Sequence, residues 1–114
     1  MKNFKNLIVW QRSMELATEI RQVVYKLPKY EQFTYRDQII RSSISIPSNL
    51  AEGSSRESRK DFKRFLRISL GSSFELETQL LLLRQDKIIE PSDLTKALVC
   101  NDEVQKMIHT LLRK

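Results

Sequence analysis

Apolar residues recur at intervals of three and four positions in four separate segments of the chain, which is the spacing of amphipathic helices. The first segment runs from about Asn6, a residue suited to cap a helix, to Tyr25 or Lys26, and Pro28 ends it. Its apolar positions are Leu7, Trp10, Met14, Ala17, Ile20, Val23, Val24 and Leu27. The linker that follows is short enough to bring the next helix back antiparallel to the first.

The second segment contains the run SISIPSNLAEGSSR, residues 43–56, whose alternation of serine and isoleucine could suggest a strand. A strand here would have no partner of similar character in the chain, so we interpret the run as part of a helix that begins near Thr34. Pro47 removes one backbone donor and is expected to kink this helix. Gly53 can adopt the left-handed conformation that closes a helix, which predicts the end of the segment there.

The third segment is the longest, and Ser58 followed by Asp61 predicts its start. Its stripe of core-facing positions is Phe62, Phe65, Ser69, Ser72, Leu76, Leu80 and Leu83. The four consecutive leucines Leu80–Leu83 span about 300° of the helix circumference. One bundle core cannot cover that arc, so the run predicts a contact between subunits of an oligomer.

The fourth segment runs from about Pro91–Ser92 to about Leu112 and carries the stripe Ala97, Cys100, Val104, Met107 and Leu111. Four amphipathic segments with short connections predict an all-α protein, an antiparallel up-down-up-down four-helix bundle in one domain over residues 1–114. The composition agrees, because 40% apolar and 30% charged residues with only two glycines and three prolines favour helices.

Small and polar residues predict how the second and third segments meet. Ser42, Ser43 and Ser45 are expected to face a set of small residues, Ser69, Gly71, Ser72 and Ser73, so that the two backbones approach closely. Arg41, Asn49 and Glu52 are expected to form a polar network that satisfies the backbone groups freed at the proline. Contact of Asn49 or Glu52 with a ligand or a nucleic acid is the alternative.

Positive charge is concentrated at the start of the third segment. The net charge is +6, and the candidate nucleic-acid-binding residues are Arg56, Arg59, Lys60, Lys63, Arg64 and Arg67. The last four share one helix face near the helix N-terminus, where the helix dipole disfavours cations. This face predicts salt-sensitive contact with the backbone of RNA or DNA. The alternative is a solvated face with Glu57–Lys60 and Asp61–Arg64 pairs.

Residues that could carry chemistry are few, and we expect a non-enzymatic protein without a metal or a cofactor. His109 lies nine positions from Cys100, on the opposite side of a helix, so the two cannot form a catalytic pair within one subunit. Cys100 is expected to be a small core residue rather than a nucleophile. No apolar run approaches the ~20 residues of a membrane span, and a cytoplasmic location is the simplest expectation.

One long stretch, QIIRSSISIPSNLAEGSSRESRKDFKRFLRISLGSSFELETQL, residues 38–80, resembles the four-helix-bundle family of 23S ribosomal RNA intervening-sequence proteins. The resemblance rests on Gln38, Arg41, Ser45-Ile46-Pro47, Asn49, Ala51-Glu52-Gly53, Arg56, Gly71-Ser72, Glu75 and Leu80. LIVWQRSMELA near the start and VQKMIHTLLRK at the end look similar too.

This resemblance implies an antiparallel bundle that assembles as a ring, a pentamer, without established catalytic activity. The family is also similar to the accessory variability proteins of diversity-generating retroelements, which are basic pentameric bundles that bind nucleic acid and a reverse transcriptase. Two functions therefore stay open: an oligomer that binds nucleic acid through the basic face, or a scaffold that binds a protein partner without touching nucleic acid.

Overall fold

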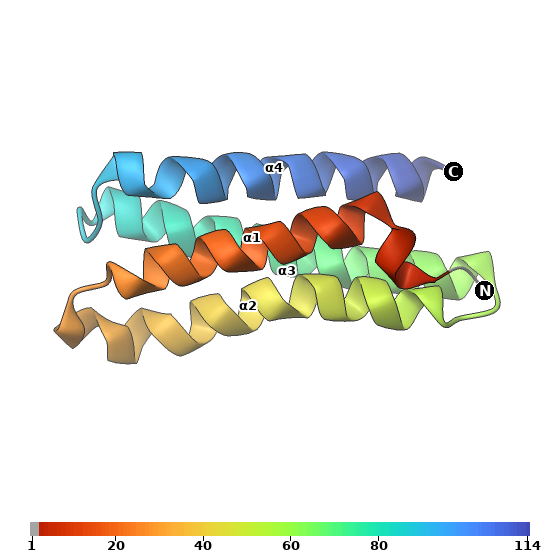
Figure 1. Cartoon of the computed structure of the whole chain (residues 1–114), viewed down its shortest axis with the longest axis horizontal. Helices are drawn as coiled ribbons and strands as arrows, with labels where there is room; N and C mark the ends of the chain where they lie inside the picture. The colour runs from red at the N-terminus through yellow and green to blue at the C-terminus, as the bar shows by residue number, and fades with distance from the viewer. Residues whose placement is uncertain (1–2) are drawn as a thin grey trace.

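Four long helices joined by short connections make up the computed structural model, which describes residues 3–114 (Figure 1). They are α1 (Ile8–Tyr25), α2 (Gln32–Ser54), α3 (Arg59–Gln85) and α4 (Pro91–Arg113), with short 3-10 helices at Phe4–Asn6 and Lys29–Glu31. No strand occurs among residues 3–114, so the predicted all-α, four-helix fold is confirmed.

The helices lie side by side, and each runs back along the long axis relative to the one before it (Figure 1). Each helix packs against two others, since α4 returns to contact α1 as well as α3. The two ends of the chain therefore lie at the same end of the bundle, where α3 also begins (Figure 1).

The start of α1 differs from the expectation. Asn6 does not cap the helix, because the chain first makes the short 3-10 helix Phe4–Asn6 and Leu7 takes the position before α1. Asn3 caps the short 3-10 helix: its side chain accepts a hydrogen bond from the backbone N–H of Lys5 at 3.0 Å. Leu7 makes no side-chain capping bond.

The helix α2 runs unbroken through Pro47 to Ser54, and the expected kink stays a prediction. The proposed role of Gly53 was wrong, since its backbone is not left-handed and it lies inside the helix. Gly53 is instead packed tightly against α3. A Cβ atom at this position would lie 2.7 Å from the Cβ of Phe65 and 3.3 Å from the Cδ1 of Phe62.

The start of α3 is as predicted: the Ser58 hydroxyl accepts from the backbone N–H of Asp61 at 3.0 Å. At its other end Lys87 adopts a left-handed conformation with φ of 57°. The N–H of Ile88 then donates to the carbonyl of Leu83 at 2.9 Å. This is the hydrogen bond of a Schellman motif, here closed by a lysine instead of the usual glycine.

One apolar core runs along the bundle between all four helices. Its fully buried side chains are Leu16, Ile20, Ile39, Ile46, Leu50, Leu66, Leu76, Leu80, Leu83, Leu94, Val104 and Ile108. Of these, Ile20, Leu76, Leu80, Leu83 and Val104 belong to the predicted stripes, whereas Leu16, Leu66, Leu94 and Ile108 do not. Met14 was wrongly assigned to the core, because it is 45% exposed. Within the leucine run, Leu80 and Leu83 are buried in this core, and Leu82 is the one classed as exposed.

Candidate nucleic-acid interface

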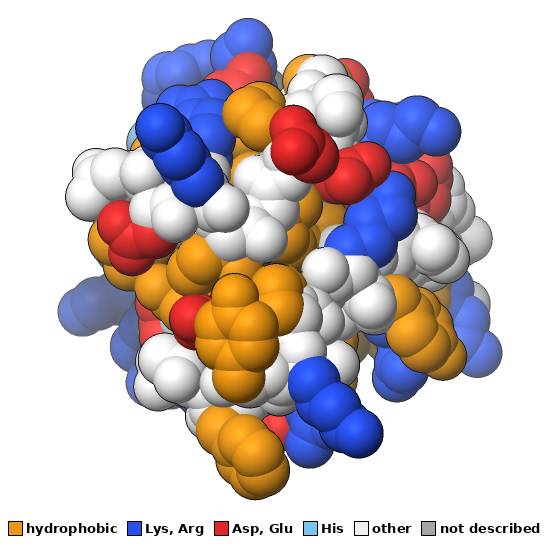
Figure 2. Space-filling model, turned by 90° about the vertical axis from the view of Figure 1, so that its left-hand side faces the viewer, with side chains coloured by type: hydrophobic (Ala, Val, Ile, Leu, Met, Phe, Trp, Pro, Cys, Tyr) orange, Lys and Arg blue, Asp and Glu red, His pale blue; other side chains and the backbone are white. Residues whose placement is uncertain are grey.

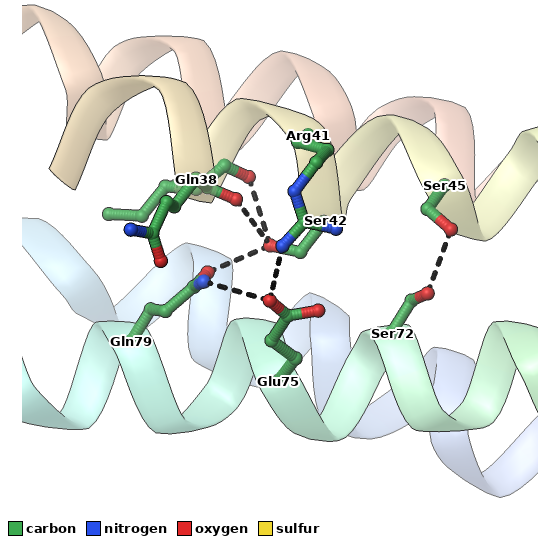
Figure 3. A network of polar contacts seen from close by, with 8 residues as sticks. Gln38, Arg41, Ser42, Ser45, Ser72, Glu75 and Gln79 are labelled. Carbon is green, nitrogen blue, oxygen red and sulfur yellow. Dashed lines mark hydrogen bonds and ion pairs between the residues drawn. The ribbon is translucent and has the colours of Figure 1, made fainter.

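Part of the predicted serine contact between α2 and α3 is present. The hydroxyls of Ser45 and Ser72 are 2.8 Å apart (Figure 3). The Ser69 hydroxyl donates to the backbone carbonyl of Ile46 at 3.0 Å, whereas Ser73 contacts α4 instead. The expectation for Gly71 was wrong: it faces away from α2, and a Cβ atom there would meet nothing within 4 Å.

The polar residues Arg41, Asn49 and Glu52 lie along α2 in three separate contacts. Arg41 pairs with Glu75 of α3, and Glu75 also accepts from the side-chain amide of Gln79 at 3.4 Å (Figure 3). Asn49 donates to the backbone carbonyl of Ser45 at 2.8 Å, one turn back. Glu52 accepts from Arg56 at 3.1 Å. Asn49 therefore satisfies a carbonyl close to Pro47, whereas Glu52 holds a cation.

Four of the six candidate cations form what we call the α3 basic face: Lys60, Lys63, Arg64 and Arg67. Spacings of three, one and three residues keep them on one side of the first turns of α3. Arg64 lies 3.8 Å from Asp61 and stacks over the ring of Phe65 at 4.7 Å. The other three make no ion pair within residues 3–114. Of the two pairs in the alternative interpretation, Asp61–Arg64 therefore forms and Glu57–Lys60 does not.

The other two candidate cations, Arg56 and Arg59, lie beside this face, at the α2–α3 connection and the first residue of α3. Arg56 pairs with Glu52 at 3.1 Å and stacks over Phe65 at 4.7 Å. The Nε of Arg59 donates to the backbone oxygen of Lys114 at 3.2 Å, which ties the start of α3 to the end of α4. Both arginines line a cavity of about 550 Å³ at this end of the bundle.

Cys100 is buried in the core, at 2% exposure, and its Sγ lies 3.7 Å from the backbone oxygen of Arg12. Burial raises the pKa of its thiol, which disfavours the nucleophilic thiolate. His109 is exposed on α4 beside Phe74. Among the described residues, no three His, Cys, Asp or Glu side chains are grouped so as to hold a metal ion. No helix in that part of the chain is long and apolar enough to cross a membrane.

Several polar contacts between helices were not predicted, and two of them involve Asn101 and Arg12. Asn101 of α4 is buried and exchanges hydrogen bonds with Ser73 of α3, donating to its backbone oxygen at 3.0 Å. Arg12 of α1 pairs with Glu103 of α4 at 2.7 Å, and this hydrogen bond raises the pKa of Arg12. The position of Asn101, next to Cys100 on the core side of α4, is the one sequence signal that could have indicated a buried partner.

The opposite end of the bundle has a different surface. Here Tyr25, Tyr30 and Phe33, around the α1–α2 connection, are 82%, 77% and 97% exposed. Figure 2 shows this end, with hydrophobic side chains among charges of both signs. The bundle thus has a basic end with a cavity and an aromatic end of mixed charge.

Comparisons with known proteins agree with this architecture. A protein of unknown function from the S23 ribosomal protein family of Bacteroides thetaiotaomicron has a similar crystal structure, with a TM-score of 0.86 and 28% sequence identity. The similarity covers 94% of this chain and 100% of that one. A search of curated proteins gives no significant match. The model of the family described as 23S rRNA-intervening sequence protein matches residues 5–110. The chain therefore belongs to the family of 23S rRNA-intervening sequence proteins.

Proposed function

We propose that this chain is a non-enzymatic, oligomeric protein whose α3 basic face binds the phosphate backbone of RNA or DNA. The observation that carries the proposal is that Lys60, Lys63 and Arg67 make no ion pair within residues 3–114. Lys60 lies in the first turn of α3, where a cation costs about 0.3–1 kcal/mol against the helix dipole. Helix stability therefore does not account for Lys60, and no ion pair accounts for the other two cations, whereas a polyanionic ligand would use all three.

The family supports RNA as the first ligand to test, because its description refers to sequences that interrupt 23S rRNA. The contacts available on the α3 basic face are charge contacts. Cations on a smooth helix face hold phosphates and set the position of the strand, while sequence is read through base edges. Binding is therefore expected to be strongly salt-dependent and weakly selective for sequence.

Assembly into a ring would strengthen this binding. A pentamer, as the resemblance implies, would present the α3 basic face five times. Linked weak sites bind a long polyanion much more tightly than one site, without any new residue type. Exposed apolar side chains such as Ile44, Ile68 and Leu82, at 48%, 42% and 39%, support a contact between subunits.

The test is a salt titration of binding to structured RNA and to duplex DNA, with solution mass measured in parallel. The test variant replaces Lys60, Lys63, Arg64 and Arg67 with Gln. The control variant replaces four exposed cations outside this face, Arg21, Lys29, Lys87 and Lys96, with Gln. Both lower the net charge equally. Only the test variant should lose affinity, and its salt slope on duplex DNA should fall by about 0.9 for each lost phosphate contact.

Two results would count against the proposal. Equal losses in the test and control variants would mean that net charge alone drives binding. An intact wild-type oligomer that binds no nucleic acid at low salt would make the α3 basic face a solvated surface.

The second candidate function is a scaffold that binds a protein partner, and the exposed aromatic end favours it. Tyr25, Tyr30 and Phe33 offer amphipathic side chains of the kind enriched in protein interfaces. The resemblance to retroelement accessory proteins suggests a reverse transcriptase as the partner. Replacing Tyr30 and Phe33 with Gln should abolish such binding and leave nucleic-acid binding unchanged, which separates the two functions.

A further inference from the structure

A cavity of about 550 Å³ opens where the α2–α3 connection, the start of α1 and the end of α4 meet. Its volume falls in the range of small-molecule sites, about 300–1,000 Å³. Three segments that are distant in sequence contribute its walls, including Leu7, Phe62 and Lys114. The cavity therefore exists only in the folded bundle.

The charge of the cavity wall is strongly positive. Arg56, Arg59, Lys63 and Lys114 line it, against a single carboxylate from Glu57. Lys63 also belongs to the α3 basic face, so that the cavity and the face form one continuous basic surface. A strand bound along that face would pass the mouth of the cavity.

The Nε–H group of Arg56 adds an observation of a different kind. It is buried and donates to no acceptor within residues 3–114. Phosphate oxygens are strong acceptors for a guanidinium. The ion pair with Glu52 and the stacking over Phe65 hold this guanidinium in place. Arg56 is thus a fixed cation in the wall of the cavity, and its hydrogen-bonding capacity is not fully used by the described residues.

The remaining wall is apolar. Leu7, Phe62 and Leu111 line it, are half-buried, and pack against the core. An inorganic anion would use only the cations, whereas a nucleotide carries both a phosphate and a flat base that can lie on apolar and aromatic side chains. The combined chemistry of the two walls therefore favours a nucleotide.

We propose that this cavity holds one unpaired nucleotide of a bound RNA or DNA strand. Its phosphate lies among Arg56, Arg59 and Lys63, and its base lies against Phe62 and Leu111. This inference rests on the proposed function, because the α3 basic face holds the adjoining strand. It adds a preference for unpaired over fully paired nucleic acid, which the basic face alone does not provide.

The experiment uses an RNA hairpin whose loop is replaced by a non-nucleotide linker, and compares the form that has an unpaired 3′ overhang with the same hairpin ended bluntly, at matched salt. A nucleoside monophosphate is titrated as a third probe. The test variant carries Leu7→Gln and Leu111→Gln, and the control carries Tyr30→Gln and Phe33→Gln at the far end of the bundle. Circular dichroism and solution mass check the fold of each variant. Lys114→Gln, at an exposed position, provides a second test if the double variant does not fold.

The wild type should bind the overhang hairpin about tenfold more tightly than the blunt one, the gain expected from one stacked base. The test variant should lose this preference and keep its affinity for the blunt hairpin, while the control keeps both. Lys114→Gln should weaken binding of the overhang hairpin more than of the blunt one.

Equal binding of both hairpins by the wild type and the test variant would overturn the cavity inference but leave the basic face intact. Binding of the monophosphate alone, lost in the test variant, would make the cavity a site for free nucleotides and overturn both the strand contact and the proposed function. Absence of binding to all three probes would overturn both proposals.

Discussion

At the scale of single residues, polar atoms buried between the helices are held in specific pairs. Ser73 and Asn101 are almost fully buried and satisfy each other across α3 and α4. Ser42 donates to the side-chain oxygen of Gln79 at 2.8 Å across α2 and α3. Leaving one of these groups without its partner costs about 1–3 kcal/mol, so the pairs favour one register of the helices over others.

Cys100 gives a prediction about pH. Burial raises the pKa of its thiol above the ordinary value of 9.0, so the folded protein holds this proton more tightly than the unfolded chain. Well below pH 9.0 the thiol is protonated in both the folded and the unfolded state, so it does not affect stability. As the pH rises above 9.0 the unfolded chain loses the proton first, and the free energy of unfolding falls. Urea unfolding at pH 8 and pH 10 should show a smaller loss for Cys100→Ala than for the wild type. Equal losses would assign the pH dependence to other groups, such as Tyr35.

Patterns in the sequence predict burial better than they predict hydrogen bonds. The sequence indicated that a set of small residues including Ser45 faces a set including Ser72, and these two do meet, but no individual pair was predicted. The partner of Asn101 depends on how far α4 is shifted along α3, which no local pattern encodes. The cavity was not predicted for the same reason, since Leu7, Phe62 and Lys114 meet only after all four helices have packed.

At the scale of elements, α3 packs tightly against α2 at a residue that has no side chain, Gly53. Gly53 lies where the first turns of α3 cross the last turns of α2, and Phe65 fills the space beside it. Gly71 lies on the outer side of α3, where its missing side chain serves no packing role that the structure shows. Two helical glycines in one chain thus have opposite effects on stability.

Replacing each glycine with alanine tests this difference. Gly71→Ala should raise the free energy of unfolding by about 0.5–1 kcal/mol, because alanine is the better helix former and the space is open. Gly53→Ala should lower it by about 1–3 kcal/mol, because the new Cβ would overlap Phe65. Chemical denaturation of both variants measures the two effects. Stabilisation by Gly53→Ala would mean that α3 can move away from α2 without loss.

Helix boundaries were predictable where the signal is local. The capping of α3 depends only on Ser58 and Asp61, three positions apart, and this prediction was correct. The end of α2 was placed within one residue of Ser54, but the role given to Gly53 was wrong. Gly53 was interpreted by its backbone freedom, whereas the chain uses its lack of a side chain against Phe65, a contact between separate helices. A glycine near a helix end can serve through its backbone freedom or through its lack of a side chain, and only tertiary packing distinguishes these two roles.

At the scale of the whole molecule, the bundle measures 45 × 22 × 19 Å, and its long sides offer most of the surface on which subunits could associate. The leucine run was expected to supply a subunit contact. Leu80 and Leu83 belong to the core of the bundle, which leaves Leu82 as the outward member of the run. The contact attributed to the run therefore depends on one side chain more than on four.

Leu82→Lys tests this contact. A lysine at an apolar subunit contact must be desolvated, so the variant should shift the solution mass towards that of the 13.5 kDa chain, while wild type gives about five times that mass if the ring is a pentamer. Gln22→Lys adds the same charge to an exposed position on α1 and should leave the mass unchanged. A Leu82→Lys protein of unaltered mass would place the contact on another surface.

The position of the two chain ends has a practical consequence for all binding measurements. Both ends lie at the end of the bundle where α3 begins, and Lys114 itself lines the cavity (Figure 1). A purification tag or fluorescent fusion at either end would stand beside the surface to be measured, and a polyhistidine tag would bring its own affinity for polyanions. Dyes are better attached in the α3–α4 connection, at Asp86 for example, at the far end of the bundle. Binding constants from tagged and untagged protein should differ for this reason alone.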